Sequence, residues 1–147
     1  NDGKLEQVSV DDAYVQEEYE RGVIPSRDAM RFHKKANRIT SAVGGGRLKN
    51  IHSSILRNDD YDMVLLFSDG VTDCLSEEEI AVITRTTDKS KLSQELVRRA
   101  LENLSIAPKE VANMFGYASE IKGGKDNSTA AVYVKDEKNR DKDERER

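Results

Sequence analysis

The sequence Met63-Val64-Leu65-Leu66-Phe67-Ser68-Asp69-Gly70-Val71-Thr72-Asp73 decides how this chain is expected to fold. Its first five residues form an apolar run of strand length, which is typical of a strand buried on both faces. We therefore expect 63–67 to be the most buried segment, and Leu66→Ala to cost about 2–5 kcal/mol of stability. Gly70 then permits a sharp turn, so that Asp69 is held at the end of a stiff strand.

Local patterns predict further helices and strands on either side of this run. Helices are expected where apolar residues recur every three to four positions behind a capping residue, and strands where apolar residues alternate between turns. Ser76 and Glu79 have the spacing of a capping box. In chain order we expect a strand over 5–8, helices over 13–21 (capped by Asp11 or Asp12) and 27–32, strands over 37–43 and 51–56, helices over 76–85, 92–104 and 108–121, and a strand over 128–134.

The order of these elements favours an α+β fold, because a block of helices stands between two strands instead of alternating with them. A chain of 147 residues has the length of one domain. Only 36% of the residues are hydrophobic and 35% are charged, so we expect a small core. No apolar residue occurs after position 135, and 135–147 is expected to be a charged, disordered tail.

The composition disfavours several classes of protein. A net charge of −4 argues against a nucleic-acid binder, and no apolar run approaches the ~18–20 residues of a membrane segment. The only cysteine, Cys74, cannot form an intrachain disulfide, and we expect it to be a small buried residue without a chemical role. His33 and His52 have no neighbouring cysteine, so a zinc site is not expected. A cytoplasmic location is predicted.

Two short motifs carry residues suited to binding a cation. One aspartate, Asp69, follows the apolar strand, and a second, in Gly123-Gly124-Lys125-Asp126-Asn127, precedes the last strand. Carboxylate oxygens of this kind suit hard cations such as Mg²⁺ or Mn²⁺. On spacing alone, an ordinary turn is the better interpretation of each motif, with Asp69 or Asp73 as a helix cap.

These motifs resemble those of a known family. The stretch 65–76, followed by Glu78-Glu79-Ile80, resembles a signature of the metal-dependent Ser/Thr protein phosphatases of type 2C. The stretch 123–129 resembles the closing motif of that family, and 37–44 is similar to the segment that precedes its apolar strand. The resemblance extends over 1–134 in the expected order, and Asp2-Gly3-Lys4-Leu5, Gly22-Val23-Ile24 and His33 are similar to bacterial members.

The resemblance implies a fold, a reaction and a site. The fold would be part of a four-layer α-β-β-α sandwich with antiparallel sheets. Two Mg²⁺ or Mn²⁺ ions would activate a water that hydrolyses phosphoserine or phosphothreonine in a phosphoprotein substrate. Asp69 and Asp126 match two metal ligands and are the expected catalytic residues, with Gly70 and Asn127 in supporting positions. We expect both aspartates to lie together at the ends of adjacent strands.

The early motifs of the family do not occur in this chain. Neither Asp2-Gly3 nor Asp69-Gly70 continues as Asp-Gly-x-Gly-Gly, and no Gly-Asp-Ser-Arg segment is present. We therefore expect 1–134 to be the C-terminal half of a phosphatase domain, inactive or weakly active without its N-terminal half. The alternatives are a non-catalytic regulatory or scaffolding module that keeps the fold without the early ligands, and an interaction domain in which the Asp-Gly turns are only turns.

Overall fold

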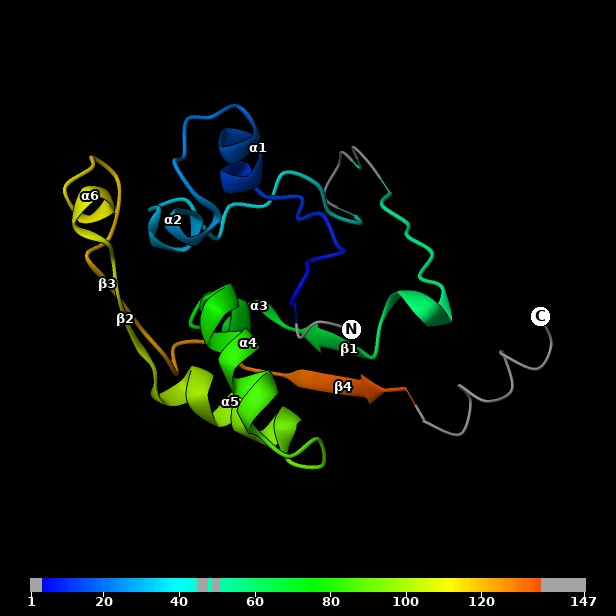
Figure 1. Ribbon diagram of the computed structural model, residues 1–147. Helices are drawn as coiled ribbons and strands as arrows, with labels where there is room; N and C mark the ends of the chain where they lie inside the picture. Colours follow the sequence, from blue (N-terminus) through cyan, green and yellow to red (C-terminus); the bar gives the residue numbers. More distant parts are fainter. Residues whose placement is uncertain (1–3, 45–47, 49–50, 136–147) are drawn as a thin grey trace.

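A computed structural model describes residues 4–44, 48 and 51–135 of the chain (Figure 1). The described part combines short helices with small antiparallel sheets, which confirms the α+β class. The four-layer sandwich stays a prediction. The elements are α1 (Tyr14–Glu20), α2 (Arg27–Phe32), the 3₁₀ turn η1 (Asn58–Asp60), β1 (Met63–Phe67), α3 (Asp69–Thr72), α4 (Glu77–Thr86), α5 (Leu92–Glu102), β2 (Leu104–Ile106), α6 (Lys109–Ala112), β3 (Glu120–Lys122) and β4 (Ala130–Val134).

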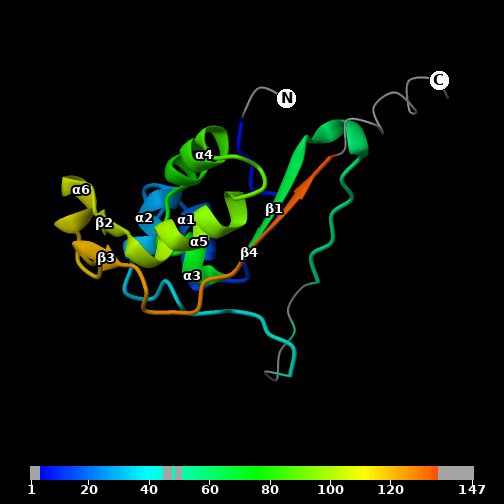
Figure 2. The same ribbon diagram turned by 90° about the horizontal axis from the view of Figure 1, so that it is seen from below.

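Strands β1 and β4 pair antiparallel and are covered by helices on one side. The register runs from Met63 opposite Val134 to Phe67 opposite Ala130. Helices α4 and α5 lie on one side of this pair (Figure 2), where α5 packs against β4, α3 and α4. The alternate strand residues that face the helices join a buried core whose centre comprises Val71, Cys74, Leu75, Ile80, Ile83, Leu92, Leu96 and Ala100.

A second apolar cluster joins the N-terminal helices to the segment after α5. Helices α1, α2 and α6 gather at one end of the molecule, beside the two-stranded β2–β3 sheet (Figure 1). Phe32 is almost fully buried there, and its carbonyl accepts a hydrogen bond from Ala118 N at 2.7 Å. The cluster comprises Val15, Ile24, Ala29, Met30, Phe32, Ala107 and Val111.

The best-predicted elements carry strong local signals. Helix α4 begins with the expected capping box, since Glu79 N donates to Ser76 Oγ at 3.2 Å and Ser76 N donates to Glu79 Oε2 at 2.8 Å. Burial raises the pKa of Glu79, but the hydrogen bonds from Ser76 and Asn103 outweigh it and hold this pKa below its ordinary value. Ser26 caps α2 in a similar way, by accepting from Ala29 N.

The prediction that 63–67 is the most buried segment is wrong. Leu66 is 65% exposed, whereas Leu92, Leu96 and Ala100 of α5 are fully buried. In the two-stranded β1–β4 pair only one face is covered, so the side chains that point to the other face remain accessible. A continuous apolar run therefore did not mean burial on both faces in the described part of the chain.

The expected strands over 5–8, 37–43 and 51–56 are also wrong. The structure has no strand in these stretches, and only an isolated bridge joins Ile39 to Ala13. Their alternating apolar residues find no neighbouring strand with which to exchange hydrogen bonds, and Ile55 is 94% exposed. A segment with alternating apolar residues forms a strand only where a partner strand is available to exchange backbone hydrogen bonds.

Three helix predictions differ from the structure. The helix expected over 92–104 ends at Glu102, and Leu104 begins strand β2 instead. The helix expected over 108–121 is limited to α6, because Gly116 has φ +92° and 120–122 pairs with β2 as strand β3. Neither Asp11 nor Asp12 caps α1; Ala13 occupies that position, and the Asp12 carboxylate lies 3.1 Å from His52 Nε2 instead.

The location of the core leads to a stability prediction. We expect Leu96→Ala to lower the free energy of unfolding by about 2–5 kcal/mol, since Leu96 is fully enclosed between α3, α4 and the β1–β4 pair. Leu66→Ala should cost less than about 1 kcal/mol, because most of that side chain is already in water. Urea unfolding of the two variants checks this, and equal costs would contradict the one-sided burial of β1.

Candidate functional site

The two aspartate motifs meet where β1 ends and β4 begins. Ser68 N donates to the Thr129 carbonyl at 3.0 Å, and Thr129 N donates to Ser68 Oγ at 2.9 Å. Ser68 Oγ donates in turn to the carbonyl of Asn127 at 3.2 Å. Because the strands are antiparallel, the end of one lies beside the start of the other. The segments that carry Asp69 and Asp126 therefore meet at the ends of adjacent strands, and the approach of the two carboxylates to each other stays a prediction.

The two motifs approach each other so closely that position 70 requires a residue without a side chain, which is glycine. Its backbone φ is not in the left-handed region, so the turn from β1 into α3 does not depend on the conformational freedom of glycine. A Cβ atom at this position would lie 2.3 Å from the Asn127 carbonyl oxygen. Ser128 Oγ also donates to the Gly70 carbonyl at 3.0 Å. The missing side chain thus lets the start of α3 pack directly against the backbone before β4.

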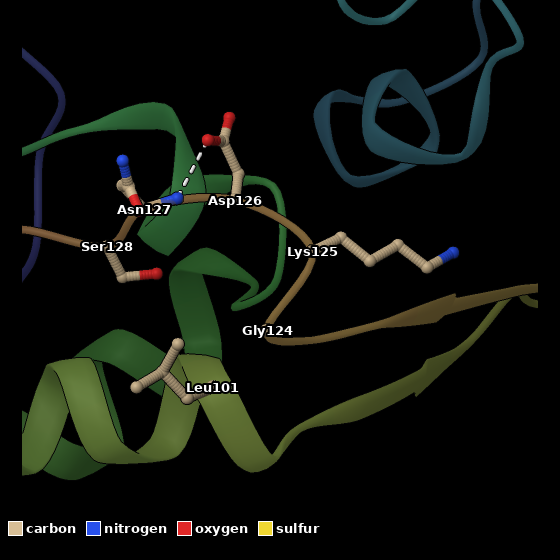
Figure 3. Close-up of a pocket in the computed structure, with 6 residues that line it drawn as sticks. All are labelled: Leu101, Gly124, Lys125, Asp126, Asn127 and Ser128. Carbon is tan, nitrogen blue, oxygen red and sulfur yellow. Dashed lines mark hydrogen bonds between the residues drawn. The ribbon is translucent and has the colours of Figure 1, made fainter.

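The two carboxylates have matching local geometry. Asp69 Oδ1 accepts a hydrogen bond from Gly70 N at 2.9 Å, and Asp126 Oδ1 accepts one from Asn127 N at 2.7 Å (Figure 3). Both residues are exposed, and the second carboxylate oxygen of each has no hydrogen-bond partner within 4–44, 48 and 51–135. Each aspartate is thereby oriented by the backbone while one oxygen stays available for a ligand.

Asp73 is a third carboxylate of this region, which sequence reasoning treated only as a possible cap. Burial raises the pKa of Asp73, and the negative charges of Asp69 and Asp126 raise it further, while Arg31 opposes the shift. The three carboxylates therefore share one electrostatic environment. The four-residue spacing from Asp69, one helical turn, is the signal that would have grouped Asp73 with it.

A surface pocket of about 430 Å³ opens beside Asp126. Figure 3 shows that its side chains come from the segment before β4 and from the end of α5. A Cβ atom at Gly123 would lie 2.0 Å from the Ala100 carbonyl oxygen, so the glycine pair lets this segment pass against the end of α5. The pocket is lined by Leu101, Gly124, Lys125, Asp126, Asn127 and Ser128.

A network of hydrogen bonds centred on the Cys74 carbonyl lies at the end of α3, next to the site. The Cys74 carbonyl accepts hydrogen bonds from Asn103 Nδ2 at 2.7 Å and from Ser105 Oγ at 2.9 Å. Arg31 Nη1 donates to the Asp73 carbonyl at 3.1 Å, which connects α2 to the end of α3. The Cys74 thiol is buried, and desolvation and the nearby Asp73 charge raise its pKa. This confirms that Cys74 is a small buried residue, and its raised pKa disfavours the thiolate.

The donor chemistry fits part of a site for a hard cation. Asp69 and Asp126 present accessible carboxylate oxygens, the ligand type that Mg²⁺ and Mn²⁺ prefer. No group of three or more His, Cys, Asp or Glu residues within the described ranges is arranged to hold a metal ion. The metal-binding role of Asp69 and Asp126 therefore stays a prediction.

Comparison with known proteins supports a relation to protein phosphatases. A sequence model of the protein phosphatase 2C family matches residues 50–113, less than half of the 147-residue chain. The match includes β1, Asp69, Gly70 and Asp73, but not Asp126 or Asn127. No curated protein and no solved structure matches the chain. Among the helices that the structure describes, none has the length and apolar composition needed to cross a membrane.

Proposed function

We propose that this chain is the C-terminal part of a metal-dependent Ser/Thr protein phosphatase domain. The observation that supports this most directly is the junction of β1 with β4, which places the Asp69 and Asp126 motifs side by side. The family match to 50–113 supports the phosphatase class, and the orientation of both carboxylates supports the assignment of the metal site.

In this proposal Asp69 and Asp126 would hold Mg²⁺ or Mn²⁺, as two ions in the complete domain. The cations would supply an acidic water and neutralise negative charge on a phosphoserine or phosphothreonine. The chain's own residues bind and orient: backbone N–H groups hold each aspartate, and the Gly70–Asn127 contact sets the separation of the two motifs. The remaining ligands would come from an N-terminal half of the domain.

Metal binding by this chain gives a first test. We expect a Mn²⁺ titration to show weak binding that Asp69→Asn or Asp126→Asn abolishes. The decrease in the electron paramagnetic resonance signal of free Mn²⁺ measures this binding. Two oriented carboxylates hold a hard cation only loosely, because Mn²⁺ prefers more oxygen ligands than the pair provides. Asp88→Asn, in the exposed turn before α5, is the matched control that should leave binding unchanged.

The second part of the same test measures the activity of the joined domain, by which we mean this chain together with the proposed N-terminal half. The chain alone should hydrolyse phosphopeptides weakly or not at all, and adding the N-terminal half should produce Mn²⁺-dependent hydrolysis that EDTA abolishes. Full activity of the chain alone would contradict the assignment of missing ligands. A joined domain that binds Mn²⁺ but has no phosphatase activity would contradict the catalytic proposal.

A further inference from the structure

A group of basic and aromatic side chains, of which Lys34, Arg38 and Phe115 are exposed and Tyr14 and Lys35 half-buried, lies outside the aspartate site. It lies where the chain leaves α2 and where the segment after α6 returns beside it (Figure 1). We call it the basic-aromatic patch and define it as Tyr14, Lys34, Lys35, Arg38 and Phe115. Lys34 N donates to the Gly116 carbonyl at 2.7 Å, and this bond fixes the two segments together.

Each cation of the patch lies over an aromatic ring. Lys34 Nζ is 4.2 Å from the centre of the Phe115 ring, and Lys35 Nζ is 4.5 Å from that of Tyr14. The Arg38 guanidinium carbon lies 5.6 Å from the same Tyr14 ring. Such contacts hold flexible cations in place, because the ring face is electron-rich. The contacts therefore favour conformations that gather the charges in one place, which lowers the entropic cost of binding.

The charges of the patch are not neutralised by ion pairs. None of Lys34, Lys35 and Arg38 forms a salt bridge with another residue of the described ranges. The ring of His33 lies between Tyr14 and Tyr117, and burial, then the charges of Lys35 and Lys34, lower the pKa of His33. Glu18 opposes that shift, but its carboxylate already pairs with Arg21 at 2.6 Å. The patch thus carries a net positive charge.

Phe115 gives the patch an apolar surface as well. Its side chain is 94% exposed, although an apolar ring of this size is normally covered in a monomer. Exposed aromatic residues beside cations are typical of protein-binding surfaces, where they supply contact area at low entropic cost. The net charge of −4 for the whole chain argues against nucleic acid as the ligand.

A hydrogen bond links the helix before the patch to the segment that follows Asp69. Arg31 Nη1 donates a hydrogen bond to the carbonyl of Asp73, and Lys34 follows Arg31 by three positions in the sequence. Their Cα atoms are therefore no more than about 11 Å apart, the extended length of three residues. A peptide that places one residue at Asp69 and Asp126 would then extend along α2 towards the patch.

We propose that the basic-aromatic patch binds an acidic segment of a polypeptide, namely the region that flanks the phosphorylated residue of a protein substrate. This inference rests on the proposed phosphatase function for the identity of the peptide, but not for the binding itself. Lys34, Lys35 and Arg38 would pair with Asp or Glu side chains, and Phe115 would contact the aliphatic part of the peptide. Electrostatic complementarity of this kind selects among partners and speeds encounter.

Binding by this chain tests the proposal without any catalysis. The probe is an unphosphorylated fluorescein-labelled peptide of three Asp-Glu repeats, compared by fluorescence anisotropy with an Asn-Gln peptide of equal length. We expect the acidic peptide to bind more tightly than the neutral one, and its affinity to fall as the salt concentration is raised. Lys34→Gln with Lys35→Gln should reduce the affinity roughly 5-fold or more. The control variant combines Lys89→Gln with Lys91→Gln. It removes the same charge from another exposed turn and should change the affinity for the acidic peptide little.

Three results would overturn the proposal: equal binding of the acidic and neutral peptides, equal losses in the two double variants, or tighter binding of a single-stranded oligonucleotide of the same charge. Phe115→Ala should also weaken peptide binding, and this exposed position allows the change without loss of the fold. In the joined domain, acidic flanks should lower the KM for phosphopeptides. Acidic-peptide binding without turnover would contradict only the catalytic proposal, whereas turnover without a preference for acidic peptides would contradict only this inference.

Discussion

In the joined domain, Asp69→Asn and Asp126→Asn are each expected to reduce Mn²⁺-dependent phosphopeptide hydrolysis by about 100-fold or more. Substitutions that act on a metal through a ligand's neighbour already cost about 10–100-fold, so the loss of a direct ligand should exceed this. The substitution to Asn keeps the size of the side chain and the oxygen that accepts the next backbone N–H. The change thus removes charge while preserving the local turn.

The control and the readouts separate loss of metal from loss of fold. Asp88→Asn also removes one carboxylate charge, from an exposed turn before α5, and should leave hydrolysis unchanged. Raising Mn²⁺ should partly restore the activity of the site variants, because weaker binding is offset by mass action. Circular dichroism should show unchanged secondary structure in all three. Unchanged hydrolysis in both site variants would remove Asp69 and Asp126 from the reaction.

Gly70→Ala is expected to destabilise the chain by about 3 kcal/mol or more. The new Cβ would lie 2.3 Å from the Asn127 carbonyl oxygen and 2.9 Å from Ser128 Oγ, so the backbone on one side must move. Overpacking of a tight contact costs about 1–3 kcal/mol, and here the displaced groups also carry the hydrogen bonds between the two motifs. Denaturant unfolding of this chain measures the loss.

A second glycine provides the comparison for this effect. Gly22 has φ +74° and open space around it, so Gly22→Ala introduces backbone strain without crowding and should cost about 1 kcal/mol. Gly70→Ala should also weaken Mn²⁺ binding, since it separates Asp69 from Asp126, whereas Gly22→Ala should not. A Gly70→Ala cost no larger than that of Gly22→Ala would show that the Asn127 carbonyl can move away freely.

Local signals in the sequence were enough for the elements that depend on near neighbours. The Ser76–Glu79 box determines where α4 begins, since both partners lie within one turn. The five-residue run of β1 and the alternation of β4 were likewise predicted within a residue or two of the observed bounds. Local spacing alone favoured ordinary turns for the Asp69 and Asp126 motifs, and only the family resemblance predicted them as metal ligands; the chain brings both motifs to one end of a strand pair.

Elements that depend on distant partners could not be predicted in this way. The stretch 120–122 reads as the end of a helix, but it forms strand β3 because β2 lies beside it. Apolar residues over 51–56 alternate as in a strand and yet remain exposed, because no strand of the described chain pairs with them. The basic-aromatic patch depends on Phe115 returning beside Lys34, a contact between segments far apart in the sequence.

The sequence and the tertiary structure determined different properties of the site. The sequence by itself determined that two aspartates in glycine-containing motifs flank the strands β1 and β4, and their role in metal binding stays a prediction. Only the tertiary structure decided that Gly70 is needed for a close backbone approach, and that Asp73 shares the field of both aspartates. The physical reason is that local patterns encode backbone preference, whereas crowding and electrostatic coupling arise between atoms that only folding brings together.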